Sequence, residues 1–170
     1  MIHKAYIAFG ANRGEPAVAY RRAVDQLAAI LGPIIAESAL YETEALTLEG
    51  TEPQANYVNA VFVCATAYSP REILNMLLET ERVLGRDRSG VERWAPRTID
   101  LDLLFVDGYV VKDEALTLPH PELHKRDFVL RPLCDVAPEL IHPLLGESIR
   151  SLEASLETRG CERFVVRAIR

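Results

Sequence analysis

Residues 98–106 read Thr-Ile-Asp-Leu-Asp-Leu-Leu-Phe-Val, and they predict the strand that completes the core of this 170-residue chain. Large apolar and β-branched side chains dominate the stretch, and neither Gly nor Pro interrupts it. Because side chains alternate across a strand, Asp100 and Asp102 are expected on one face. The residues expected on the other face are Ile99, Leu101, Leu103 and Phe105. Carboxylates roughly 6.5–7 Å apart on one face can converge on hydrated cations, although a solvated strand face would also explain them.

The segment before this strand concentrates positive charge in a chain whose net charge is −6. Its arginines are Arg86, Arg88, Arg93 and Arg97. A guanidinium binds phosphate with two parallel hydrogen bonds and stays charged, so this cluster beside a carboxylate pair indicates phosphoryl transfer with Mg²⁺. A solvated basic loop, or an ion pair from Arg97 to Asp100 or Asp102, is the alternative. The sequence contains no Walker loop, Rossmann fingerprint or kinase catalytic-loop pattern.

The elements up to and including this strand follow the order β-α-β-β-α-β. The expected strands cover residues 5–9, 34–41, 57–66 and 98–106, and the expected helices begin at Pro16 and Pro70. This order predicts an α+β, ferredoxin-like core with an antiparallel sheet and both helices on one face, which leaves the other face free for a site.

The rest of the chain predicts additions to this core. Asp107-Gly108 favours a hairpin that returns as a short strand over residues 109–112. The expected C-terminal additions are helices over residues 127–136 and 148–159 and a last strand over residues 164–169.

Two polar residues interrupt apolar patterns. Asn59 shares a face of the strand over residues 57–66 with Tyr57, and it requires either a ligand or a partner that satisfies a structural amide. Glu81 borders the apolar stripe of the second helix, and its spacing favours a surface position. The polar loop over residues 42–55 is long for so small a chain, which is typical of functional or mobile loops.

Composition predicts a single domain over residues 1–170, with 49% hydrophobic and 26% charged residues. The net charge of −6 argues against a nucleic-acid or membrane-surface partner. No stretch approaches membrane-spanning length, and no signal peptide is visible. Cys64, Cys134 and Cys161 lie far apart without metal-ligand spacing, which suits a reducing compartment. We therefore expect a cytoplasmic protein, and a monomer.

Residues 93–104, Arg-Trp-Ala-Pro-Arg-Thr-Ile-Asp-Leu-Asp-Leu-Leu, closely resemble the signature of the 6-hydroxymethyl-7,8-dihydropterin pyrophosphokinase family. The similarity continues in matching order over roughly residues 5–140. Its other parts are residues 8–12, 40–43, 56–60, 85–88, 118–120, 126, 128 and 137–140. The resemblance implies a ferredoxin-like core and an enzyme of folate biosynthesis. Such an enzyme transfers the β,γ-pyrophosphoryl unit of ATP to the hydroxymethyl oxygen of the pterin and releases AMP.

The resemblance also implies roles for individual residues. Asp100 and Asp102 match ligands of two Mg²⁺ ions, and Arg86 and Arg97 match catalytic arginines that contact phosphates. The residues that match the pterin site are Thr43, Leu46, Tyr57, Asn59, Trp94 and Phe128, of which Tyr57 and Phe128 would sandwich the ring. The residues that match ATP contacts are Glu81, Arg88, Arg93, Thr117, His120 and Arg126. The implied partners are ATP and 6-hydroxymethyl-7,8-dihydropterin. The alternatives are a Mg²⁺-dependent nucleotidyltransferase and a non-catalytic ligand-binding module of the same fold.

Overall fold

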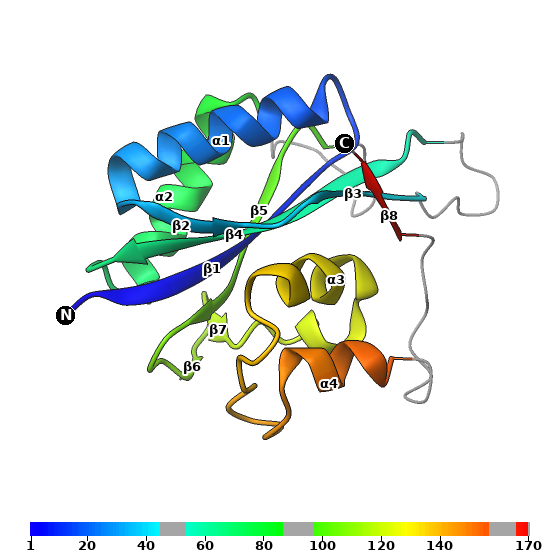
Figure 1. Cartoon of the computed structure of the whole chain (residues 1–170). Coiled ribbons are helices and arrows are strands. Elements are labelled where there is room, and N and C mark those ends of the chain that lie inside the picture. The colour runs from blue at the N-terminus through cyan, green and yellow to red at the C-terminus, as the bar shows by residue number, and fades with distance from the viewer. Residues whose placement is uncertain (45–53, 87–96, 157–165, 170) are drawn as a thin grey trace.

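A computed structural model describes residues 1–44, 54–86, 97–156 and 166–169. Its main sheet is antiparallel, with the order β5-β1-β4-β3-β8 and with β2 also paired to β4. The strands are β1 (His3–Ala11), β2 (Ile34–Glu37), β3 (Leu40–Thr43), β4 (Tyr57–Thr66), β5 (Asp100–Val106) and β8 (Val166–Ile169). Helices α1 (Pro16–Leu31) and α2 (Pro70–Val83) cover one face (Figure 1). Helices α3 (Asp127–Val136) and α4 (Ile149–Ala154) lie on the opposite face. The α+β, ferredoxin-like prediction is confirmed.

Local signals in the sequence explain how the first two helices begin. Pro occupies the first helical turn of both α1 and α2, where its missing N–H costs nothing. The capping box of α2 forms as expected: the Ser69 N–H donates to Glu72 Oε2 at 2.8 Å, and the Glu72 N–H donates to Ser69 Oγ at 3.4 Å. Because this box and the proline act within four residues, the start of α2 is predictable from sequence.

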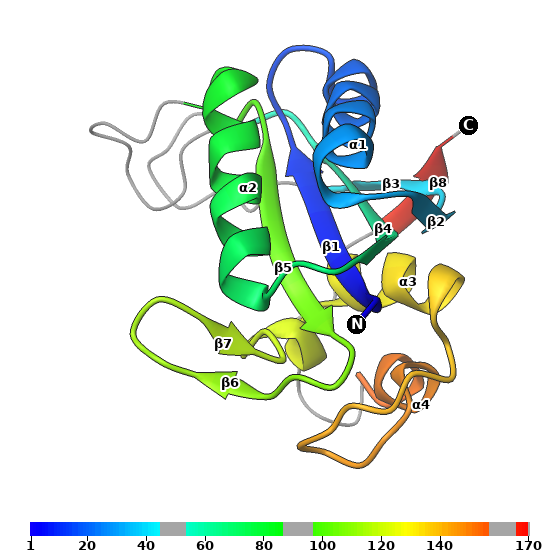
Figure 2. The ribbon, with the colours of Figure 1, turned by 90° about the vertical axis from the view of Figure 1, so that its left-hand side faces the viewer.

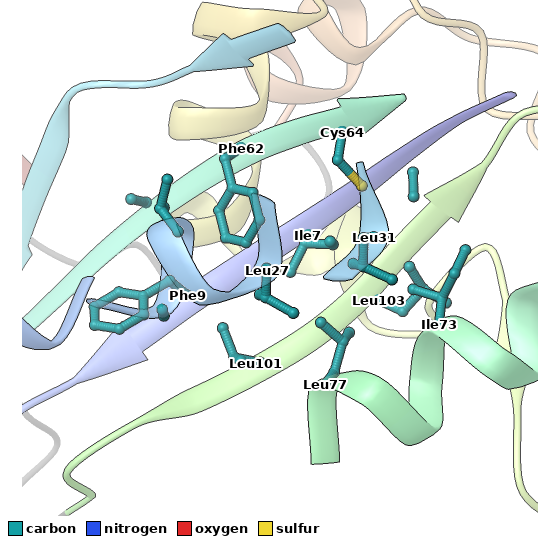
Figure 3. Packing of buried hydrophobic residues seen from close by; sticks show 14 of the residues in the cluster. Ile7, Phe9, Leu27, Leu31, Phe62, Cys64, Ile73, Leu77, Leu101 and Leu103 are labelled. Atoms are coloured by element: carbon teal, nitrogen blue, oxygen red, sulfur yellow. The ribbon is translucent and has the colours of Figure 1, made fainter. Parts of the chain in front are cut away.

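The main core lies between the sheet and the α1–α2 layer (Figure 3). Three alternate residues of β4, Ala60, Phe62 and Cys64, contribute to it together with Leu27 of α1 and Leu77 of α2. The alternate β4 residues, Val61 and Val63, enter a second cluster on the opposite face. The helical residues that complete this second cluster are Val129, Leu130, Leu133, Ile149 and Leu152. The expectation that this face is free is therefore wrong over the part that α3 and α4 cover.

The strand expected over residues 34–41 is two strands, β2 and β3. Both pair with β4, and Ser38 lies at the break between them. The Ser38 hydroxyl accepts a hydrogen bond from the Val61 N–H at 2.9 Å, in a place where a regular ladder would use a backbone carbonyl. A side-chain acceptor of this kind competes with regular pairing, and nothing in the residue types of 34–41 marks the interruption beyond Ser38 itself.

The predicted hairpin after β5 is also wrong. Gly108 turns the chain with a φ of 77°, but the returning strand β6 (Val111–Lys112) pairs with β7 (Thr117–Leu118) in a separate ribbon (Figure 2). The segment that follows β7 pairs with the outer edge of β5 instead. There the His120 N–H donates to the Leu104 carbonyl at 2.9 Å.

Two further expectations change in detail. Phe105 was expected beside Leu101 and Leu103, but a register shift against β1 leaves Leu104 as an extra residue and moves Phe105 into the second cluster. The helix predicted over residues 148–159 is α4, which covers Ile149–Ala154; residues 157–159 lie outside the described chain.

Candidate active site

The register of the sheet places polar residues of β4 and β5, which are far apart in sequence, on either side of β1. In β1, Gly10 pairs with Asn59 of β4 on one side and with Asp100 of β5 on the other. Ala8 of β1 likewise lies opposite Asp102. Paired residues of an antiparallel sheet share a face, so the amide and both carboxylates lie on one face of three neighbouring strands. The central strand contributes only small residues between them. A Cβ on Gly10 would lie 3.3 Å from Asn59 Oδ1, so the glycine keeps this space open.

The Asn59 side of this face holds a buried amide–hydroxyl pair. Asn59 Nδ2 donates to Thr43 Oγ1 at 2.8 Å, and the two residues are 7% and 3% exposed. Tyr57 lies directly opposite Thr43 in the β3–β4 register and therefore shares its face. Burial raises the pKa of the Tyr57 hydroxyl, which keeps the ring neutral. The alternative that Asn59 is a structural amide is therefore correct for its side-chain NH₂ group, which donates to Thr43.

Asp100 lies between two arginines. Arg86 Nη1 donates to Asp100 Oδ1, and Arg97 Nη1 donates to Asp100 Oδ2. Each arginine therefore engages a separate oxygen of the same carboxylate, which is exposed to only 21%. The ion pair that we considered for Arg97 exists, and it involves Asp100.

Glu81 is buried, and the expectation that it lies at the surface is wrong. It is 1% exposed, and its Oε1 accepts hydrogen bonds from Arg86 Nη1 and, at 2.7 Å, from the Leu101 N–H of β5. A buried carboxylate needs a charged partner and hydrogen-bond donors, and Arg86 together with the β5 backbone supplies both. Helical spacing alone could not show that α2 packs against the edge strand at this position.

Asp102 is half-buried, and the loss of water around it, followed by the negative charge of Asp100, raises its pKa to about 6. The two carboxylates thus repel each other, which is the chemistry that a shared cation relieves. Among the described residues, no group of three or more His, Cys, Asp or Glu side chains could hold a metal ion. A pair of carboxylates still fits Mg²⁺, which commonly takes one or two protein carboxylates and completes its shell with water and phosphate oxygens.

An open cleft of about 430 Å³ runs beside the edge strand β5. Asp102, Thr117 and His120 line it together with leucines of α2 and β5. Burial, and then the positive charge of Arg126, lowers the pKa of His120, which favours the neutral imidazole. The Arg126 guanidinium lies 5.8 Å from the centre of the Phe128 ring, at the start of α3. Arg126 therefore lies near both His120, which is predicted for the ATP site, and Phe128, which is predicted for the pterin site.

Asn12 is a residue of this region that the sequence did not single out. Asn12 is 5% exposed; its backbone N–H donates to the Arg97 carbonyl at 3.0 Å, and its Oδ1 accepts from the Arg97 N–H at 2.8 Å. Its Nδ2 donates to Gln54 Oε1 and to the Ala55 carbonyl, both at 3.2 Å. A lone Asn in a Gly-rich loop was the available signal, and its partners are distant in sequence. Four other predicted site residues, Leu46, Arg88, Arg93 and Trp94, lie outside the described residues.

The antiparallel α+β fold, with a carboxylate pair flanked by arginines on one sheet face, defines a ferredoxin-like phosphotransferase domain. A profile of the 7,8-dihydro-6-hydroxymethylpterin-pyrophosphokinase (HPPK) family matches residues 6–138. The chain belongs to this family. It is an ATP-dependent pyrophosphokinase of folate biosynthesis that acts on hydroxymethyldihydropterin.

Relatives cover nearly the whole chain. The 2-amino-4-hydroxy-6-hydroxymethyldihydropteridine pyrophosphokinase of Methylorubrum extorquens is 39% identical over 161 residues, which is 94% of this chain and 98% of that protein. The enzyme of the same name from Pseudomonas aeruginosa is 35% identical over 164 residues, covering 96% and 98% of the two chains. Plasmodium falciparum HPPK-DHPS, solved with pterin and p-hydroxybenzoate, has a TM-score of 0.74 at 18% identity. The match covers 94% of this chain and 42% of the Plasmodium chain. The shared fold therefore corresponds to less than half of that longer protein.

Proposed function

We propose that this chain, as a single domain, transfers the β,γ-pyrophosphoryl unit of ATP to 6-hydroxymethyl-7,8-dihydropterin at the face shared by β4, β1 and β5. The observation that carries the proposal is the register of Gly10 between Asn59 and Asp100. It puts a candidate pterin-binding amide on β4 and a candidate metal-binding carboxylate on β5, on either side of β1, which has no side chain at Gly10 between them.

The pterin is bound at the β4 side of this face. Asn59, held by Thr43, offers its amide to the edge of the heterocycle, and the fixed rotamer lowers the cost of ordering it on binding. Tyr57 and Phe128 supply the flat apolar surfaces for stacking on the ring. The family resemblance assigns Leu46 and Trp94, which lie outside the described residues, to the pterin site as well.

Asp100 and Asp102 bind two Mg²⁺ ions. When bound there, the ions would supply positive charge that neutralises the charge of the phosphates. A raised pKa at Asp102 supports this assignment, because the site disfavours two unneutralised carboxylates. The number of two ions is what the family resemblance implies, and two carboxylates on one strand face offer enough oxygen ligands for it.

The arginines act on the phosphates. Arg86 and Arg97 stand within hydrogen-bond reach of Asp100, and a bound triphosphate would compete for the same guanidinium groups. Glu81 holds Arg86 from the other side, so this arginine stays in place when its bond to Asp100 is exchanged for one to phosphate. In the transfer step the hydroxymethyl oxygen bonds to the β-phosphorus. The bond from the β-phosphorus to the α,β-bridging oxygen breaks, AMP leaves, and the hydroxyl proton passes to solvent.

The nucleotide occupies the cleft beside β5. Thr117 and His120 line it, and Arg126 lies close enough to His120 to lower the pKa of its imidazole. The family resemblance assigns phosphate contacts to Arg88 and Arg93, which lie outside the described residues. A neutral His120 suits a hydrogen-bonding role toward the nucleotide, since it can both donate and accept.

The enzyme is a cytoplasmic monomer whose partners are small molecules. Cys64 and Cys134 are free thiols, which supports a reducing compartment. No helix in the described part of the chain is both long and apolar enough to cross a membrane.

Incubation with ATP, Mg²⁺ and 6-hydroxymethyl-7,8-dihydropterin tests the proposal, with the adenine nucleotide product identified by chromatography. AMP and a diphosphorylated pterin are expected, and Asp100→Asn is expected to abolish both while the thermal melt still shows a folded protein. Release of pyrophosphate would instead identify a nucleotidyltransferase. Pterin binding without any product would identify a non-catalytic module.

A further inference from the structure

The ribbon formed by β6 and β7 lies beside the end of β5 (Figure 2). Its turn and Thr117 of β7 form one wall of the cleft beside β5. Residues 113–117, which include the turn of the ribbon, line the cleft, and Leu74 and Leu78 of α2 line it as well. Leu116 and Leu118 are 8% and 1% exposed and join the main core, so the ribbon is anchored at its base.

Asp113 organises the turn at the tip of this ribbon. Its Oδ1 accepts hydrogen bonds from the N–H groups of Ala115 and Leu116, at 2.9 and 2.8 Å. Its own N–H donates to the Leu116 carbonyl at 3.0 Å. These backbone donors lower the pKa of Asp113, so the carboxylate is charged at neutral pH and the turn is closed by three bonds to one residue.

Arg71 ties the same carboxylate to α2. Arg71 Nη2 lies 2.9 Å from Asp113 Oδ2. Arg71, Leu74 and Leu78 are spaced three and four residues apart along α2, so they share one face of the helix. The ion pair therefore joins the two walls of the cleft: the helix that carries the leucines and the turn that faces them.

We propose that Asp113 is a positioning residue for the nucleotide and that, through Arg71, it sets the separation of the two cleft walls. The inference rests on the proposed function, because it takes the cleft to be the ATP site. The printed contacts of this pair are with each other and with the turn of the ribbon, and none is with Asp100, Arg86 or Arg97. Loss of the pair acts on the binding of MgATP, and the transfer step and the pterin site are untouched.

The size of the effect follows from the exposure of the pair. Its side chains are 50% and 44% exposed, and exposed ion pairs are weak. Breaking the pair alone is therefore expected to raise the KM for MgATP about two- to fivefold. Asp113→Ala, which also removes the acceptor of two backbone N–H groups, is expected to raise it about tenfold or more.

The test compares Arg71→Met, Arg71→Lys, Asp113→Asn and the double variant Arg71→Met/Asp113→Asn. Both KM values and kcat come from AMP release, and calorimetry with a non-hydrolysable ATP analogue measures binding directly. Arg71→Met and Asp113→Asn should each raise the KM for MgATP, Arg71→Lys should restore most of the affinity, and the double variant should be no weaker than the single ones. Arg150→Met is the matched control, because Arg150 makes an exposed 2.9 Å pair with Glu139 on α4's side of the sheet.

An unchanged KM for MgATP in both single variants would overturn the inference. An equal rise of both KM values would also overturn it, because it would indicate a general loss of structure. A wild-type chain that releases no AMP would overturn the proposed function instead. Calorimetry with the analogue would then still decide whether the pair controls nucleotide binding.

Discussion

Asn12 and Arg97 are joined by two hydrogen bonds across 85 residues of sequence. Arg97 is one of the two arginines whose side chains hold Asp100, so Asn12 fixes the backbone from which one of the cations of the site projects. The same amide reaches Gln54 and Ala55, which precede the pterin-side strand β4. One buried side chain thus connects the segments that lead to both halves of the proposed site.

Asn12→Ala is expected to lower kcat by about tenfold or more and to destabilise the fold by roughly 1–3 kcal/mol, because buried backbone groups lose their partners. Steady-state kinetics and urea unfolding measure the two effects. Gln26→Ala is the control. The side-chain amide of Gln26 in α1 also joins two elements, because it donates to Thr80 of α2, but this bond lies in the helical layer. Equal loss of kcat in both variants would show that Asn12 has no special link to the site.

Arg97→Ala is expected to lower kcat by about a hundredfold or more while changing the Kd for the pterin by less than threefold. The guanidinium is proposed to act on phosphate charge, and such electrostatic contributions appear mainly in the transition state. Pterin fluorescence titration and AMP release separate the two quantities. A parallel loss in both would mean that Arg97 only supports the local structure.

Asp102→Asn is expected to raise the free energy of unfolding of metal-free protein near pH 7.5, although it removes a metal ligand. The pKa of Asp102 is raised to about 6 in the folded state from 3.8, so the folded protein binds the extra proton more tightly than the unfolded chain. The contribution of this group to stability is full below pH 3.8 and is lost as the pH rises through about 6. The asparagine avoids that loss, which is on the order of 2–3 kcal/mol.

Thermal melts in EDTA at pH 4.5 and pH 7.5 test this prediction. The difference in Tm between Asp102→Asn and wild type should be clearly larger at pH 7.5. A difference that is the same at both pH values would contradict the electrostatic origin.

Glu81→Leu is expected to cost more stability than Glu81→Gln. Glutamine keeps an oxygen that accepts from the Leu101 N–H and loses only the charge facing Arg86. Leucine leaves a buried N–H and a partly buried guanidinium without that acceptor, at a further cost of roughly 1–3 kcal/mol. Urea unfolding provides the comparison, and equal midpoints for the two variants would contradict the role of Glu81 as an anchor of β5.

Gly10→Ala is expected to raise the KM for the pterin several-fold with little change in the KM for MgATP. The new Cβ would lie 3.3 Å from Asn59 Oδ1, so the amide must shift by a few tenths of an ångström. The φ of Gly10 is not positive, so backbone strain does not contribute. The ratio of the two KM values is the measurement, and a selective rise in the KM for MgATP would place the pterin elsewhere.

The sequence predicted the elements of this fold better than it predicted their neighbours. The boundaries of β4 and the start of α2 agree with the alternation and the capping box, since both signals act within a few residues. The sequence did not predict the bulge at Leu104 or the pairing of β6 with β7 in place of β5. Each depends on which strand lies alongside, and a local pattern does not contain that information. Glu81 was misplaced for the same reason.

By itself, the sequence determined which chemistry is available: a carboxylate pair on one strand face, a run of arginines before it and a polar amide within an apolar strand. Local backbone preferences and side-chain alternation suffice for that much. Only the tertiary structure decided that Asp100 and Asn59 both pair with Gly10, from opposite sides of β1, and that Asn12 forms hydrogen bonds with the backbone of Arg97. These relationships are set by strand order and register, which long-range hydrogen bonds and core packing select and which no local pattern encodes.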